Sequence, residues 1–423
     1  MEISMIRTGL VATLFSCVLV ACGGGGGGGS TGPVATPVAT TQQITASTFS
    51  TPAVLNANFR LARIDYRYDT PANSLNAKGY QTTSFEAVSA TIDQIKAIGF
   101  TGIIFQLETP INKDTGAVAL NDVPGTVKTP PKALWRLVDY AKSQGLKVWI
   151  SMPPVSSISD CGLATDFTKY SEQSMFVNIV DYMIPVVSQA ETHHVDGIFI
   201  GEGDLYSPQH LQYWVFLINQ VKTVFSGKLS YSVHLGVDTP IWNYVDYPAI
   251  TVDTALSTSP VTNDLQTIAK LFLNDAYGQN EVNQIKSIFN SYNKKVILTA
   301  TYMGADTGVN NTPSTFFDSM LFSFAVSTAS PNELVNNEDL KNLKMRAFLE
   351  VIGLQLSDVV VGTTNTEFAP WLMDKNFSDP STQNPTYKYW CCGWEISNDT
   401  AIQKTLNDYF SKPWGYHTLN SLN

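Results

Sequence analysis

Short apolar runs that alternate with helical segments most restrict the fold of this chain. The runs are continuous in their apolar character, which indicates strands of a parallel sheet covered on both faces. They begin at Phe59 and recur as far as Thr364. We expect strands at residues 59–66, 102–107, 147–152, 196–200, 228–234, 248–254, 295–302 and 358–364.

The segments between these runs have the periodicity of amphipathic helices. Gly99 and Gly145 follow the first two, where glycine commonly ends a helix. Eight strands with helical connections predict an α/β fold, a (β/α)8 TIM barrel. The alternative is an open doubly wound sheet, which usually carries a glycine-rich phosphate loop after its first strand, and none follows here. We expect helices at 84–98, 130–143, 166–191, 208–225, 241–245, 281–292, 337–356 and 399–410.

The first residues have the three zones of an export signal. Arg7 supplies a positive charge, Leu10–Val20 is mostly apolar, and Leu19-Val20-Ala21-Cys22 ends the apolar run. This last stretch resembles the lipobox of bacterial lipoproteins, which implies a signal peptide at 1–21 and lipid on Cys22. An ordinary secretory signal, with an incidental cysteine, is the alternative.

A linker follows the signal. Residues 22–58 are rich in Gly, Ser, Thr, Pro and Ala and carry no charge, so we expect a disordered tether before a barrel at 59–423. The predicted location is the bacterial cell envelope, with the protein anchored to the membrane by lipid. Gly23 is not the aspartate that resembles an inner-membrane retention signal in enteric lipoproteins, which favours the outer membrane.

Composition narrows the partners. The net charge of −10 and the lack of a basic cluster argue against nucleic acid. No Cys-x-x-Cys or His-x-x-x-His spacing occurs, so we expect no metal or other cofactor, and we expect a monomer. Cys161, Cys391 and Cys392 remain after the lipid site; a bridge between the adjacent pair and a bridge from Cys161 to one of them both stay open.

Acidic side chains gather where the predicted strands end, which is where such barrels carry their chemistry. Glu202 is the foremost, because Gly201 and Gly203 flank it and allow close approach. Carboxylates beside aromatic side chains suit a carbohydrate, since sugars stack on aromatic rings and glycosidic bond cleavage needs two carboxyl groups. The other candidates for substrate binding are Asp65, Glu108, His234, Trp242, Asp253, Tyr302, Trp371 and Trp394.

Part of the chain resembles the retaining glycoside hydrolases of clan A, especially family 113, which contains β-mannanases. The matching stretches are DGIFIGEGDL, GKLSYSVH and IWNYVDYPAITVD, within residues 196–256. The resemblance implies a barrel in which Glu202 is the general acid/base. Two departures stand out: Gly201 occupies a position where the family has Asn or Thr, and Thr301 lies near the position of the nucleophilic glutamate.

The second carboxylate therefore stays open among Asp204, Asp306 and Glu367. Our leading hypothesis is a membrane-anchored glycoside hydrolase that cleaves O-glycosidic bonds of a poly- or oligosaccharide. The alternative is a non-catalytic barrel that binds glycans, favoured by the missing glutamate of the seventh strand. A metal-dependent hydrolase would need a His/Asp cluster, and His234 with Asp253 is too small a set.

Overall fold

The chain divides into two units, Met1–Gln43 and Ile44–Asn423, and all described residues belong to the second. The computed structural model describes residues 58–64, 85–107, 109–112, 114–118, 131–155, 170–202, 210–252, 264–274, 278–300, 306–309, 334–336, 338–368 and 399–422. The predicted signal, tether and lipid site, and the three remaining cysteines, lie outside these ranges. No helix within these ranges is both long and apolar enough to cross a bilayer.

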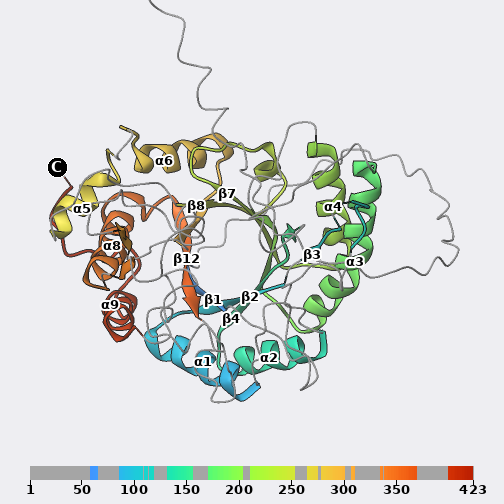
Figure 1. Ribbon diagram of the computed structural model, residues 1–423, viewed down its shortest axis with the longest axis horizontal. Coiled ribbons are helices and arrows are strands. Elements are labelled where there is room, and N and C mark those ends of the chain that lie inside the picture. The colour runs from blue at the N-terminus through green and yellow to red at the C-terminus, as the bar shows by residue number, and fades with distance from the viewer. Residues whose placement is uncertain are drawn as a thin grey trace, which may run out of the picture. The chain divides into compact units, whose positions relative to one another are not determined.

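Eight parallel strands close into a barrel, with helices around its outside (Figure 1). The ring runs β1, β12, β9, β8, β7, β6, β4 and β2, and β2 pairs again with β1. The closed ring confirms the (β/α)8 barrel over the open sheet. The strands are β1 (Phe59–Ile64), β2 (Gly102–Gln106), β4 (Lys147–Ser151), β6 (Gly197–Glu202), β7 (Lys228–His234), β8 (Tyr247–Thr251), β9 (Val296–Ala300) and β12 (Val360–Phe368).

The helices follow the predicted pattern, with additions. The short helix α5 and two small sheets outside the barrel, β3 with β5 and β10 with β11, are absent from the sequence prediction. The small strands are β3 (Thr109–Pro110), β5 (Pro154–Val155), β10 (Asp306–Val309) and β11 (Leu334–Asn336). The helices are α1 (Phe85–Ile98), α2 (Pro131–Ser143), α3 (Glu172–Thr192), α4 (Leu211–Val224), the 3-10 helix η2 (Pro240–Asn243), α5 (Leu265–Leu271), α6 (Glu281–Tyr292), α8 (Glu338–Val351), the π-helix η4 (Ile352–Leu356) and α9 (Thr400–Phe410).

Local signals explain why the helices begin and end where they do. The side chain of Asn280 accepts a hydrogen bond from the backbone amide of Asn283 and caps α6. Asp399 caps α9 in the same way, through the amide of Ile402. Gly99 follows α1 with a φ of +103°, a left-handed conformation that glycine adopts without strain. Because these signals can be read in the sequence, the predicted bounds of α1, α6 and α9 agree closely with the observed ones.

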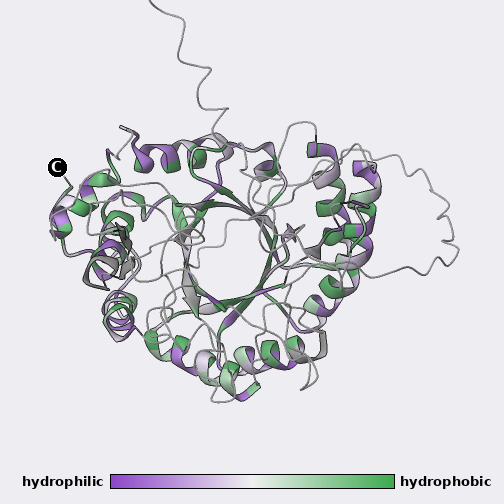
Figure 2. Ribbon diagram, in the orientation of Figure 1, coloured by the Kyte–Doolittle hydropathy of each residue, from purple (hydrophilic) through white to green (hydrophobic). Residues whose placement is uncertain are grey.

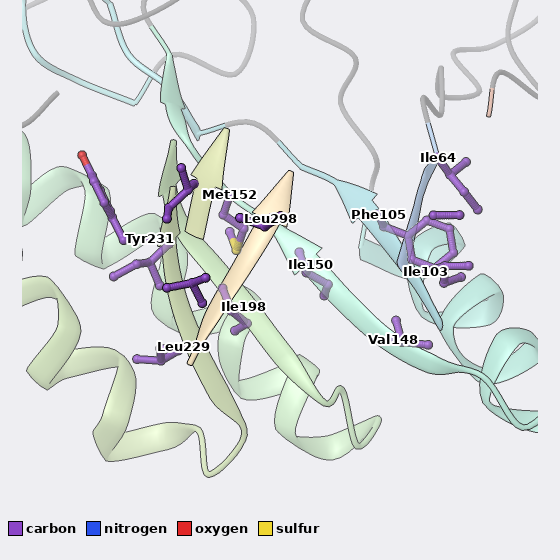
Figure 3. Close-up of a cluster of buried hydrophobic side chains, with 14 of the residues drawn as sticks. Ile64, Ile103, Phe105, Val148, Ile150, Met152, Ile198, Leu229, Tyr231 and Leu298 are labelled. Carbon is purple, nitrogen blue, oxygen red and sulfur yellow. The ribbon is translucent and has the colours of Figure 1, made fainter. Parts of the chain in front are cut away.

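The main core lies between the barrel and its helices. Apolar residues dominate the strands, whereas the helices carry both apolar and polar residues (Figure 2). Figure 3 shows the strand contribution, with Ile103 and Phe105 from β2 and Val148 and Ile150 from β4, all buried. Residues that alternate with these on the same strands point into the barrel. The interior of the barrel is therefore a second, separate environment.

Candidate functional site

The amino-terminal half of the barrel interior is apolar and closed. Four aromatic rings meet there: Trp149 lies 5.6 Å from Phe59 and 5.2 Å from Phe199 between ring centroids, and Phe59 lies 5.9 Å from Tyr247. Burial and the nearby Asp246 raise the pKa of Tyr247 to about 12, so its hydroxyl stays neutral. This half is packed core and offers no room for a substrate.

The carboxyl-terminal half of the interior is polar. The alternation of the strands places small hydroxyl side chains there, and all are buried. Ser232 Oγ lies 3.1 Å from Thr251 Oγ1, whereas buried Ser151 Oγ has no hydrogen-bond partner in the described part of the chain. A buried hydroxyl without a partner is uncommon and suits a site that receives a polar ligand. The inward polar residues are Arg63, Gln106, Ser151, Ser232, His234, Thr251, Thr299 and Thr364.

A β-bulge determines where Glu202 stands on β6. Phe199 pairs with Ser230, but Glu202 pairs with Ser232, so β6 has one more residue than β7 over this stretch. Without the bulge, alternation from inward Phe199 would place Glu202 on the outer face. With it, Glu202 takes an inward register position. β6 also extends to Glu202, beyond the predicted strand end at residue 200.

Gly201 makes this bulge possible. A Cβ atom at this residue would lie 2.8 Å from Trp214 Cη2 and 2.8 Å from Tyr231 Cδ2. Both rings belong to the core outside the barrel, so the Cβ direction of Gly201 faces outward. A larger residue at 201 would collide with these rings. The departure from the Asn or Thr of clan A enzymes therefore has a local steric cause.

A second bulge acts in the same way on β12. Ala62 pairs with Asn365, whereas Arg63 pairs with Glu367 and Ile64 with Phe368. Phe368 is fully buried in the outer core. Glu367, the residue before it, therefore takes an inward register position beside Arg63.

Two predicted site residues have described side chains. His234 is partly exposed at the carboxyl end of β7, in the polar half of the interior, and its role in binding stays a prediction. Trp242 was expected to bind sugar, but it is fully buried in η2, and its indole N–H donates to the Tyr231 carbonyl at 2.9 Å. The ring packs against Tyr292. Trp242 therefore has a packing role, and that part of the prediction is wrong.

The structure describes the other predicted site residues only in part or not at all. The backbone of Asp306 lies on β10, in a two-stranded sheet outside the barrel ring. The described inward residues of β9 are Ile297 and Thr299, so this part of β9 carries no carboxylate. Asp65, Glu108, Asp204, Asp253, Thr301, Tyr302, Trp371 and Trp394 lie outside the described residues.

Sequence reasoning missed Arg63 and the ring of hydroxyl side chains. A usable signal was present in KLSYSVH, where Ser230, Ser232 and His234 recur at every second position. That period marks one face of a strand. Among the described residues, no cluster of three His, Cys, Asp or Glu side chains could hold a metal ion.

Comparisons with known proteins now add to this geometry. No protein-family model matches the chain, and no curated protein matches its sequence. Solved structures do match. A GH113 β-1,4-mannanase superposes with a TM-score of 0.57 at 13% identity, over 84% of this chain and 100% of that chain.

Two further mannanases agree. The GH113 β-mannanase from Alicyclobacillus acidocaldarius gives a TM-score of 0.55 at 12% identity, over 84% of this chain and 97% of that one. The endo-β-1,4-mannanase from Thermotoga petrophila gives 0.50 at 10% identity, over 84% and 77%. At such identities the likeness shows the fold. The chain shares the (β/α)8 barrel fold of these mannanases.

Proposed function

We propose that this protein is a glycoside hydrolase that cleaves O-glycosidic bonds of a poly- or oligosaccharide, with Glu202 as general acid/base. The observation that carries the proposal is the bulge that gives Glu202 an inward register position in the polar half of the barrel. The carboxyl ends of the strands are the working end of such barrels. The fold shared with mannanases supports the same class of substrate.

The reaction needs one proton donor and one ionised carboxylate. Glu202 would protonate the glycosidic oxygen as the bond from C1 to that oxygen breaks, with the electron pair leaving on the oxygen. The second carboxylate, from Asp204, Asp306 or Glu367, would either bond to C1 or take a proton from the attacking water. In the first case water, deprotonated by Glu202, then attacks C1 and breaks the bond between C1 and the carboxylate; in the second case the water attacks C1 directly, and in both its hydroxyl ends on C1. The net change is hydrolysis of one bond.

Substitution of Glu202 tests the proposal. We expect Glu202→Gln to lower turnover by about 10²–10⁴-fold, because the amide is too weak an acid to protonate the leaving oxygen, while binding persists. The assay is reducing-end release from β-1,4-mannan, β-1,4-xylan, carboxymethylcellulose and starch, with binding measured by calorimetry. Asp358→Asn, at an exposed residue just before β12, is the control. Undiminished turnover in Glu202→Gln would sink the assignment.

One observation favours a second function, a barrel that binds glycans without cleaving them. The described inward positions of β9 hold Ile297 and Thr299, and the sequence has Thr301 near the position where clan A enzymes carry their nucleophilic glutamate. Under this alternative the unaltered protein binds a polysaccharide of the panel and releases no reducing ends. Release above the level of the Glu202→Gln variant excludes it.

The proposal includes the lipid anchor at Cys22, which would hold the enzyme at the cell envelope. Metabolic labelling with a radioactive fatty acid should mark the protein, and Cys22→Ser should abolish the label and release the protein from the membrane fraction. A Cys22→Ser variant that keeps both would contradict the anchor.

A further inference from the structure

The strand pairing places Glu202 and Glu367 at one level of the barrel. In an eight-stranded barrel with a shear of about eight, the paired residue on each next strand lies about one residue lower along the barrel axis. β12 is four strands from β6. The β12 residue at the level of Glu202 therefore lies about four positions after the β12 residue that the successive pairings reach. The bulge before Glu367 adds one residue to this stretch of β12, so the residue level with Glu202 is Glu367. The chain of partners runs Glu202, Ser232, Ala249, Ile297 and Gly362.

The two glutamates also stand on opposite walls. β6 and β12 are four strands apart in either direction around the ring. Both register positions are inward, and each depends on its own bulge. Two carboxyl groups on opposite sides of a bond are what glycosidic cleavage requires. By contrast, Asp306 belongs to a small sheet outside the ring.

The neighbours of the two positions differ in charge. Glu367 pairs with Arg63, which is 9% exposed and inward on β1. Glu202 pairs with Ser232, a neutral hydroxyl. An arginine stays charged in proteins and favours the ionised form of a carboxyl group beside it. Environments that separate the protonation of two carboxyl groups assign the acid and base roles.

We propose that Glu367 is the second carboxylate of this site, and that Arg63 is a positioning residue that favours its ionised form. This inference rests on the proposed function. In this assignment Glu202 gives its proton to the leaving oxygen. Glu367 supplies the electron pair, either to C1 or to a proton of the attacking water, and Glu202 is reprotonated when the cycle closes.

Glu367→Gln tests the carboxylate. We expect a loss of about 10²–10⁴-fold in turnover on the polysaccharide that the unaltered chain cleaves fastest, with binding retained. Asp358→Asn, at the exposed residue just before the same strand, is the matched control and should keep full turnover. Loss of turnover in Glu202→Gln together with full turnover in Glu367→Gln overturns this inference and leaves the proposed function standing.

Arg63 is tested by the pH profile of kcat/KM. Arg63→Met removes the charge, so the acidic limb, which reports the ionised carboxylate, should move to higher pH by about 1–3 units. Arg63→Lys keeps the charge and should restore most of the limb. A merely structural role would lower turnover in both variants without moving the limb, and that result overturns the role of Arg63.

A measurement without substrate separates the two proposals. Carbon NMR of protein labelled at glutamate carboxyl groups, compared with Glu367→Gln, follows the titration of Glu367 alone. Its midpoint should lie lower in the unaltered chain than in Arg63→Met. Equal midpoints overturn the coupling. If the chain cleaves nothing in the panel, the proposed function fails, while a shifted midpoint still supports the pairing of Arg63 with Glu367.

Discussion

The two halves of the barrel interior are filled by different kinds of side chain. At the amino-terminal end, large rings fill the space, and glycine lets them approach: a Cβ at Gly197 would lie 2.6 Å from the ring of Trp149, and one at Gly362 2.6 Å from the Phe59 carbonyl oxygen. At the carboxyl-terminal end, serine and threonine replace the rings, and Arg63 is buried among them. The first arrangement excludes every ligand, whereas the second suits a polar one.

Irregular strand pairing serves each half differently. The shift between Val360 and Gly362 on β12 brings a glycine opposite Phe59, where the ring needs space. The shifts before Glu202 and Glu367 bring carboxylates to inward register. Irregular strand pairing therefore tightens the packing at the amino-terminal end of the barrel and brings carboxylates to inward positions at the carboxyl-terminal end. Stability and chemistry are separated along the barrel axis.

The largest effect on stability should come from Trp149. Trp149→Ala would remove a buried ring that contacts Phe59 and Phe199, and the loss should lower the free energy of unfolding by about 3–5 kcal/mol. Thermal unfolding followed by circular dichroism measures the change.

The matched change at the other end is Ser232→Ala, which removes one hydroxyl and its contact with Thr251. We expect it to lower the free energy of unfolding by about 1 kcal/mol. A Ser232→Ala variant as unstable as Trp149→Ala would break the division between the two halves.

Most of the fold could be predicted from the sequence, because continuous apolar runs mark strands that are buried on both faces. The predicted strand at residues 228–234 matches β7 in both bounds, and the predicted helix at 281–292 matches α6. The ends of β6 and β12 were placed too early. Both strands continue past their apolar runs to Glu202 and Phe368, since backbone pairing with a neighbour holds them there.

The site was less predictable, because a bulge breaks the two-residue period on which the assignment of strand faces depends. Nothing in the local pattern shows that Glu202 faces inward until the pairing with Ser232 is known. Trp242 illustrates the reverse case. Its place in a segment between strands suggested an exposed ring, but η2 packs it between Tyr231 and Tyr292, and only the tertiary arrangement reveals this.

The amino-terminal end of the barrel is also held from outside, by the last residues of the chain. Arg60, on β1, donates from Nη1 to the Phe410 carbonyl at 2.6 Å and from Nη2 to the Lys412 carbonyl at 3.0 Å. The carboxylate of Glu350, at the end of α8, accepts hydrogen bonds from the backbone amides of Thr418 and Leu419. The chain end therefore fastens α8 and α9 to β1.

The last prediction concerns the pH dependence of this fastening. Burial alone would raise the pKa of Glu350, but the Leu419 amide and the Thr418 and Tyr409 hydroxyls together lower it below its ordinary value of 4.5. A carboxyl group with a lowered pKa in the folded state stabilises the fold above its unfolded pKa, and this stability is lost as pH falls through the folded pKa.

Glu350→Gln should therefore lower the free energy of unfolding more at pH 7 than at pH 4. The pH-dependent part is roughly 1.4 kcal/mol for each unit between the folded and unfolded pKa values. Urea unfolding of both proteins at the two pH values measures it, with Glu86→Gln at an exposed residue of α1 as control. If Glu350→Gln lowers the free energy of unfolding equally at both pH values, the charge of Glu350 makes no contribution to stability and the prediction is wrong. Turnover should stay within a few fold at pH 7, because this fastening lies at the end of the barrel that carries no chemistry.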